Sequence, residues 1–178
     1  MPCHGPGPAP HGPRPHDRVA LRLLRPADAS ALTRVYSGAA VRYTTGHVLT
    51  LAEARAKIRA DRAAATELPP TRWAWGITLG ADVIGRITVR RTVDTTASLG
   101  YILRPDTWGR GHATDAVLAV LRFATARTGL VRLEARHHPD NPASGRVLVR
   151  AGFRRVGTWR RTEGGRSVAY PLYGIHVR

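Results

Sequence analysis

The segment from Leu99 to Ala116, LGYILRPDTWGRGHATDA, constrains the fold more than any other part of the chain. It begins as a short apolar strand, and its glycines Gly109 and Gly111 precede a helical pattern that we expect to start at Thr114. Glycine lets a backbone approach an anion closely, and the first N–H groups of a helix have no partner within the helix. A strand, a small-residue loop and a helix start in this order predict a phosphate-binding turn.

The glycine spacing excludes the two commonest nucleotide loops, because no Lys-Ser/Thr follows and the pattern is not G-x-G-x-x-G. A second segment, RLEARHHPDNPASGRVLVRAGFRRVG, covers Arg132 to Gly157. It places Asn141 and Ser144 at a predicted helix start, between two predicted strands.

The two segments together resemble the GNAT acyltransferases, whose pyrophosphate loop is written Q/R-x-x-G-x-G/A. Here the loop reads Trp108-x-x-Gly111-x-Ala113, with tryptophan in the first position. This departure and the second segment resemble the subgroup that acetylates the N-terminal alanine of ribosomal proteins. The resemblance extends over Arg18 to Val177. It implies a single α/β domain with a central, mostly antiparallel sheet of six to seven strands, one splayed strand pair and about four flanking helices.

Hydrophobic periodicity and turn residues give the expected elements. The predicted strands cover residues 19–25, 72–79, 83–91, 97–103, 130–136, 153–160 and 168–177, and the predicted helices cover 26–40, 50–66, 114–128 and 141–151. Thr50 and Glu53 form a capping-box pattern at the start of the second helix.

The first 17 residues are rich in proline and glycine, which predicts a disordered arm ahead of a domain over residues 18–178. We expect no secretory signal and no membrane span. The one cysteine, Cys3, lies in the arm, so no internal disulfide is possible and a cytoplasmic location is expected. His4, His11 and His16 also lie there without fixed geometry, and we predict no metal site.

The chain carries 28 Lys and Arg but only 12 Asp and Glu, for a formal net charge of +16, and Lys57 is its one lysine. The basic residues are spread along the chain and not clustered in a nucleic-acid-binding motif. This charge attracts polyanions, including the phosphates of coenzyme A.

The resemblance implies acetyl-CoA as co-substrate and assigns cofactor-binding residues. Pantetheine is expected to pair with the backbone of Ile102, Leu103 and Arg104. Asn141 is expected to bond the pantetheine. The pyrophosphate is expected at the loop and the first helical turn, formed by Gly109, Arg110, Gly111, His112, Ala113 and Thr114.

Ser144 is the expected proton donor to the leaving thiolate, by resemblance to the ribosomal-protein subgroup. No tyrosine lies between Asn141 and Trp159, so the tyrosine that many GNAT enzymes use on this helix is absent. The alternative is that Asn141 and Ser144 only cap the helix. For the general base, Glu134 is the first candidate, Asp94 and Glu67 are alternatives, and ordered water alone is a further alternative.

Aromatic and polar residues could shape an acceptor groove or belong to the core: Tyr43, Thr44, Thr45, Trp73, Trp75 and Tyr101. A succinyl donor is a further possibility, with Arg86, Arg90 or Arg91 receiving its carboxylate. The predicted function is N-acetyl transfer from acetyl-CoA to a primary amine, on a protein N-terminus or a small molecule, by direct attack in a ternary complex. The alternatives are a catalytically silent acyl-CoA sensor or a basic nucleic-acid-associated protein. A homodimer is compatible with the sequence.

Overall fold

A single sheet of seven strands organises residues 19–177, the part of the chain that the computed structural model describes. The predicted arm at residues 1–17 lies outside the described residues. The strands are β1 (Ala20–Arg22), β2 (Arg72–Leu79), β3 (Asp82–Val93), β4 (Thr96–Leu103), β5 (Arg132–Arg136), β6 (Arg154–Glu163) and β7 (Arg166–His176). Their order is β1-β2-β3-β4-β5-β7-β6, and only the β4–β5 pair is parallel. This mixed sheet confirms the predicted fold class.

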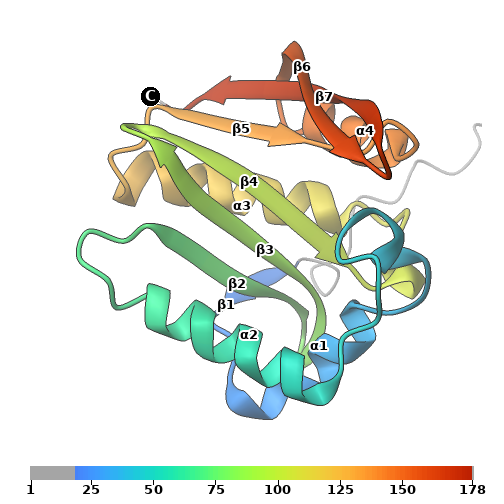
Figure 1. Ribbon diagram of the computed structural model, residues 1–178. Helices are drawn as coiled ribbons and strands as arrows, with labels where there is room; N and C mark the ends of the chain where they lie inside the picture. The colour runs from blue at the N-terminus through green and yellow to red at the C-terminus, as the bar shows by residue number, and fades with distance from the viewer. Residues whose placement is uncertain (1–18, 178) are drawn as a thin grey trace, which may run out of the picture.

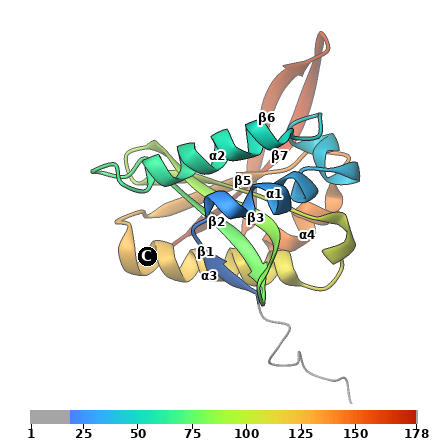
Figure 2. The ribbon, with the colours of Figure 1, turned by 90° about the horizontal axis from the view of Figure 1, so that it is seen from below.

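Helices cover both faces of the sheet (Figures 1 and 2). The helices α1 (Ala29–Val35) and α2 (Leu51–Ala64) lie on one face, and α3 (His112–Arg127) and α4 (Pro142–Arg150) lie on the other. Alternate residues of a strand point to opposite faces, so each face has its own core. Leu99 and Leu133 pack in the core beneath α3 and α4, whereas Ile102 packs in the core beneath α1 and α2.

The strands β4 and β5 pair at one end and separate at the other (Figure 1). Their pairing runs from Thr96–Arg132 to Leu99–Ala135 and goes no further, although β4 continues to Leu103. The polar backbone edge of β4 beyond Leu99 therefore faces a gap instead of a neighbouring strand. This is the expected splayed pair.

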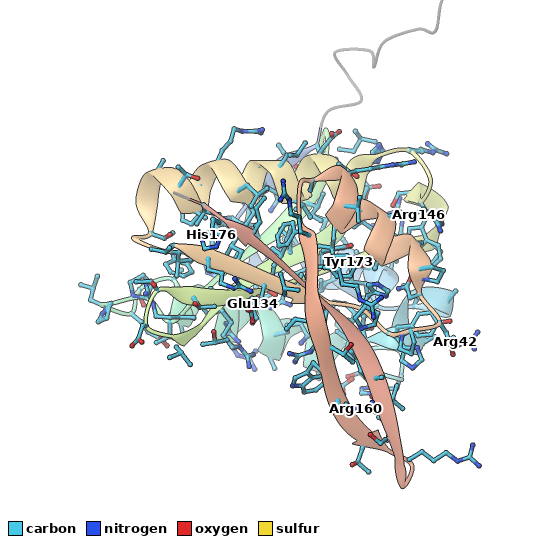
Figure 3. All side chains as sticks on the ribbon, turned by 90° about the horizontal axis from the view of Figure 1, so that it is seen from above. Arg42, Glu134, Arg146, Arg160, Tyr173 and His176 are labelled. Carbon is cyan, nitrogen blue, oxygen red and sulfur yellow. The ribbon has the colours of Figure 1, made fainter. Side chains whose placement is uncertain are left out.

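The β6–β7 hairpin extends beyond the rest of the sheet, on the side opposite α3 (Figures 2 and 3). The strand β7 pairs with β5 through residues from Leu172 to His176, and its earlier residues pair only with β6. The projecting half of the hairpin thus stands beside the gap between β4 and β5.

Element boundaries differ from the sequence predictions at two informative places. The predicted helix over residues 26–40 is divided into a 3₁₀ turn, α1 and the 3₁₀ helix η3 (Gly38–Tyr43), because Gly38 has a φ of 53° that no α-helix accommodates. The helix α3 begins at His112, two residues earlier than predicted.

The predicted capping box at the start of α2 is confirmed. Thr50 N donates to Glu53 Oε2 at 2.7 Å, and Glu53 N donates to Thr50 Oγ1 at 3.2 Å.

Candidate active site

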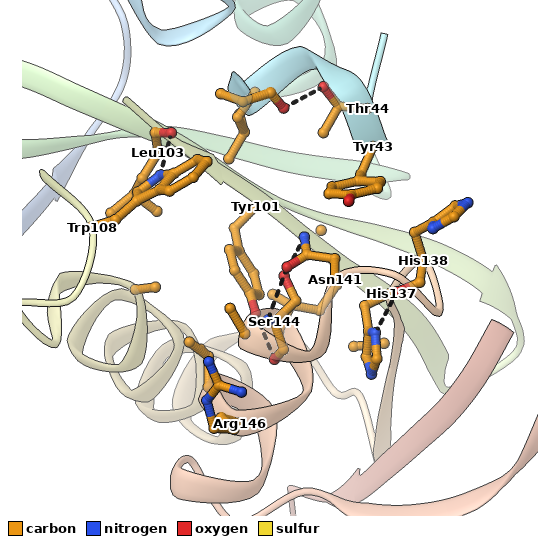
Figure 4. Close-up of a pocket in the computed structure, with 18 of the residues that line it drawn as sticks. Tyr43, Thr44, Tyr101, Leu103, Trp108, His137, His138, Asn141, Ser144 and Arg146 are labelled. Carbon is orange, nitrogen blue, oxygen red and sulfur yellow. Dashed lines mark hydrogen bonds between the residues drawn. The ribbon is translucent and has the colours of Figure 1, made fainter. Parts of the chain in front are cut away.

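A cavity of about 570 Å³ occupies the gap between β4 and β5 (Figure 4). Segments far apart in sequence line it, and we divide them into three parts. The loop end is formed by Trp108, Gly109, Gly111, His112, Ala113 and Thr114. The middle includes Leu99, Gly100, Tyr101, Ile102, Leu103, Asn141 and Ser144. The hairpin end includes Tyr43, Thr44, Arg136, His137, His138, Trp159, Arg161 and Tyr170.

At the loop end, two left-handed glycines bring the chain into α3. Gly109 has a φ of 76°, and Gly111, the N-cap of α3, has a φ of 85°. Residues other than glycine rarely adopt these φ values. No atom lies within 4 Å of where a Cβ would stand on either glycine, so the backbone is open for close approach by a ligand. Because α3 begins at His112, the amides of His112, Ala113 and Thr114 belong to its first turn. The exposed Arg110 does not line the cavity.

Trp108 fixes this loop to β4. Its indole Nε1 donates to the carbonyl oxygen of Leu103 at 2.9 Å, at the end of the splayed strand. The tryptophan that replaces the usual first residue of the loop therefore joins the strand end to the glycine turn. The side chain is half exposed and lines the cavity.

Only some backbone groups of β4 face the gap where pantetheine is expected to bind. Arg104 N donates to Ile84 O at 2.8 Å, toward β3. Because backbone groups alternate along an antiparallel ladder, the polar backbone groups of Ile102 also face β3, whereas those of Tyr101 and Leu103 face the gap. Arg104 does not line the cavity; its guanidinium bonds Asp82 and Asp106, which raise its pKa. Ile102 lines the cavity although its polar backbone groups face β3, and Arg104 does not line it. Tyr101, which the expected cofactor set omits, also lines the cavity.

Asn141 and Ser144 meet at the start of α4, as the sequence predicted. The Asn141 side chain caps the helix by accepting from Ser144 N at 3.3 Å, and its Nδ2 donates to Ser144 Oγ at 3.3 Å. Tyr101 Oη donates to the carbonyl oxygen of Ser144 at 3.0 Å and so joins β4 to α4 across the gap (Figure 4). Burial raises the pKa of Tyr101 to about 12, so the phenol remains a donor at neutral pH.

None of the three candidate carboxylates lines the cavity. Glu134 lies within the paired part of β5, and its Oε1 accepts from Arg132 Nε at 2.8 Å. Asp94 stands at the β3–β4 turn and Glu67 follows α2. In the described part of the chain, the lining of the cavity contains no Asp or Glu. Glu134 was expected to border the cofactor gap, but it lies outside the lining of the cavity. The β4–β5 pairing continues beyond Glu134 to Ala135, so the gap opens only after that residue.

Aromatic rings form a continuous wall at the hairpin end. Tyr43 stacks on His138 with ring centroids 4.9 Å apart, and His138 meets Tyr170 edge-on at 5.5 Å. Tyr170 meets Trp159 at 5.4 Å, and the Arg136 guanidinium lies 3.8 Å from the Trp159 ring centroid. Sequence reasoning found Tyr43 but missed the other four, whose elements meet only in the folded sheet.

The remaining expected acceptor or donor residues lie elsewhere. Trp73 and Trp75 pack edge-on against Phe123 of α3, so they belong to the core and do not line the cavity. Arg86 lines the cavity, but its Nε and Nη2 donate to the two carboxylate oxygens of Asp61 at 2.7 and 2.6 Å. The Asp61 side chain is only 4% exposed. Arg90, Arg91 and Thr45 are not among the lining residues.

A glycine turn that opens a helix, an unpaired strand edge and a second helix start meet in one cavity, the arrangement expected for a CoA-dependent acyltransferase. The chain belongs to the GNAT acetyltransferases, because the family model described as the acetyltransferase (GNAT) domain matches residues 18–154. It is an N-acetyltransferase with a single GNAT domain.

Known proteins similar to this chain agree. The uncharacterized N-acetyltransferase YoaA of Bacillus subtilis is 28% identical over 148 residues, which are 81% of this chain and 84% of YoaA. Mycobacterium smegmatis RimJ, solved in complex with CoA-disulfide, superposes with a TM-score of 0.75 at 25% identity, over 89% of this chain and 81% of RimJ. The ribosomal L7/L12 α-N-protein acetyltransferase RimL, solved with coenzyme A, shares the fold with a TM-score of 0.77 at 18% identity, over 89% of this chain and 94% of RimL. The family match confirms the resemblance to the GNAT acyltransferases noted in the sequence, and RimL shares the fold.

No helix of residues 19–177 is both long enough and apolar enough to cross a membrane.

Proposed function

We propose that this enzyme transfers the acetyl group of acetyl-CoA to a primary amine by direct attack in a ternary complex. One observation carries the proposal: a single cavity connects the glycine loop, the unpaired edge of β4 and Ser144 with the aromatic wall. A cofactor laid from the loop along β4 would bring its thioester to Ser144. An acceptor would enter from the hairpin end.

The cofactor is held mainly by backbone groups in this proposal. The amides of Gly111, His112 and Ala113 meet the pyrophosphate, with the positive end of α3 adding a favourable field. Arg146 of α4 lines the cavity and lies on the α3 side of Ser144, where it adds charge for the phosphates (Figure 4). Pantetheine pairs with the backbone of Tyr101 and with the N–H of Leu103, whose carbonyl oxygen already accepts from Trp108 Nε1. Of the three arginines expected to receive a succinyl carboxylate, Arg86 is already paired with Asp61, and Arg90 and Arg91 do not line the cavity. We therefore propose an acetyl donor.

The acceptor nitrogen attacks the thioester carbonyl carbon, a C–N bond forms and the C–S bond breaks. Ser144 Oγ gives its proton to the departing thiolate, and Asn141 Nδ2 orients that oxygen. The acceptor ammonium first gives a proton to water and becomes the attacking neutral amine. After the C–N bond forms, the nitrogen loses a further proton, which returns through water to Ser144 Oγ. No Asp or Glu of the described chain lines the cavity, and we assign both transfers to water. Proximity then supplies much of the rate. Glu134, bonded to Arg132, takes no direct part.

A thiol-release assay with acetyl-CoA against small amines and N-terminal peptides tests the proposal. Turnover that yields N-acetyl product by mass spectrometry supports it. Tight binding of acetyl-CoA without thiol release on any amine would instead identify an acyl-CoA sensor.

A further inference from the structure

The hairpin end of the cavity carries positive charge. Five arginines line the whole cavity: Arg86, Arg136, Arg146, Arg150 and Arg161. Arg86 is neutralised by Asp61, and Arg146 and Arg150 stand on α4. Arg136 and Arg161 remain at the hairpin end, beside the aromatic wall.

Arg136 is the free cation of this end. Arg136 is exposed, and no carboxylate oxygen of residues 19–177 lies within 4.0 Å of its guanidinium nitrogens. Its guanidinium carbon lies 3.8 Å from the centroid of the Trp159 ring. When a guanidinium group stacks on an aromatic ring, its N–H groups point outward in the guanidinium plane. They can then donate two hydrogen bonds to one anion. Arg161 Nε lies 3.7 Å from Glu163 Oε1, so its charge is partly balanced.

This charge selects among acceptors. A primary amine in water at neutral pH is an ammonium ion, and like charges near a low-dielectric cavity repel it. A carboxylate-lined acceptor site would attract such a cation. The described lining contains no Asp or Glu, and the neighbouring Glu163 is already bonded to Tyr170 and lies 3.7 Å from Arg161. An acceptor that carries its own anionic group is attracted to Arg136, and its amine can then reach Ser144.

Resting on the proposed function, we infer that the acceptor is a small amine that bears a carboxylate or phosphate group, which Arg136 binds, with an apolar or planar part against the wall of Trp159, Tyr170 and His138. Free cationic amines are poor acceptors.

Matched pairs of amines test this inference. In the carboxylate arm, phenylalanine is compared with phenylalaninamide; in the phosphate arm, phosphoethanolamine is compared with ethanolamine. The wild-type kcat/KM should favour the anionic member of at least one pair by about tenfold or more, and the favoured pair identifies the source of the charge. Equal or better use of phenylalaninamide and ethanolamine, the members that lack the anionic group, would overturn the inference and leave acetyl transfer intact.

Substitutions of Arg136 test whether this residue causes the preference for acceptors that bear an anionic group. Arg136→Gln should reduce the preference to below about threefold with the KM for acetyl-CoA unchanged, and Arg136→Lys should keep most of it because the charge remains. Arg160→Gln is the matched control, since Arg160 is an exposed arginine of β6, the strand that carries Trp159, and does not line the cavity (Figure 3). A preference that survives Arg136→Gln would contradict the role of Arg136.

Calorimetry of the same pairs in the presence of CoA separates the inference from the proposed function. Tighter binding of an anionic member without thiol release would support the acceptor class and reject acetyl transfer. Absence of any charge preference in binding and in turnover would reject the inference.

Discussion

The phenol oxygen of Tyr101 donates to the carbonyl oxygen of Ser144 at 3.0 Å, across the gap where β4 and β5 separate. The bond joins the strand that would hold pantetheine to the helix that carries the proposed acid. It therefore fixes the distance between the two halves of the site.

Replacing Tyr101 by Phe should lower the free energy of unfolding by about 1 kcal/mol, since one buried hydrogen bond is lost. The pH dependence should also change. Burial raises the pKa of the folded-state phenol to about 12, above the unfolded value of about 10. The wild type therefore keeps its full stability below pH 10 and loses stability as the pH rises toward 12.

Denaturant unfolding at pH 9 and pH 11 measures the effect. The wild type should lose about 1 kcal/mol more than Tyr101→Phe between these two values. Parallel losses in both proteins would show that the phenol does not titrate with a raised pKa.

Replacing Gly111 by Val should weaken acetyl-CoA binding at least about tenfold, which is about 1.4 kcal/mol. The branched side chain would fill the open approach to the loop and oppose the φ of 85°. Calorimetry on folded protein measures the affinity. Gly80→Val is the control, because Gly80 also has a positive φ of 59° and open space but lies in the β2–β3 turn. Equal cofactor affinity in wild type and Gly111→Val would remove the loop from the site.

Replacing Ser144 by Ala should slow the chemical step by about 10²-fold while acetyl-CoA affinity stays within about threefold, the scale of a positioned proton donor. Single-turnover rates with saturating acetyl-CoA are the measurement, because product release can hide the step. Ser30→Ala, in the first turn of α1 and away from the cavity, is the control. Rates within a factor of two would reduce Ser144 to a helix-start residue.

Replacing Gly145 by Ala should destabilise the protein, although alanine ordinarily favours a helix by about 1 kcal/mol. The added Cβ would stand 2.6 Å from His137 Nε2 and 3.2 Å from Tyr173 Oη. Overpacking of this kind costs about 1–3 kcal/mol. In a His137→Ala background the same substitution should become neutral or stabilising, and urea unfolding of the four proteins completes the cycle. An unchanged cost in that background would contradict the contact.

Local signals in the sequence were sufficient for much of the fold. Strand β2 has the predicted bounds, the capping box opens α2, and the paired glycines precede α3. These features depend on neighbours within a few residues, so periodicity and turn chemistry determine them. The interrupted helix near Gly38 was missed, because a single glycine does not by itself distinguish a helix interruption from a tolerated residue.

The sequence by itself determined the family, the glycine turn before α3 and the pairing of Asn141 with Ser144, because each depends on contiguous motifs. The tertiary structure alone decided which side chains share the cavity. It separated Glu134 from the site by one further residue of strand pairing, and it placed Trp73 and Trp75 in the core. It also placed the Arg136 guanidinium against the Trp159 ring, although the two residues lie on different strands and far apart in the sequence. Strand order and register set such contacts, and both are fixed by packing over the whole sheet rather than by local sequence.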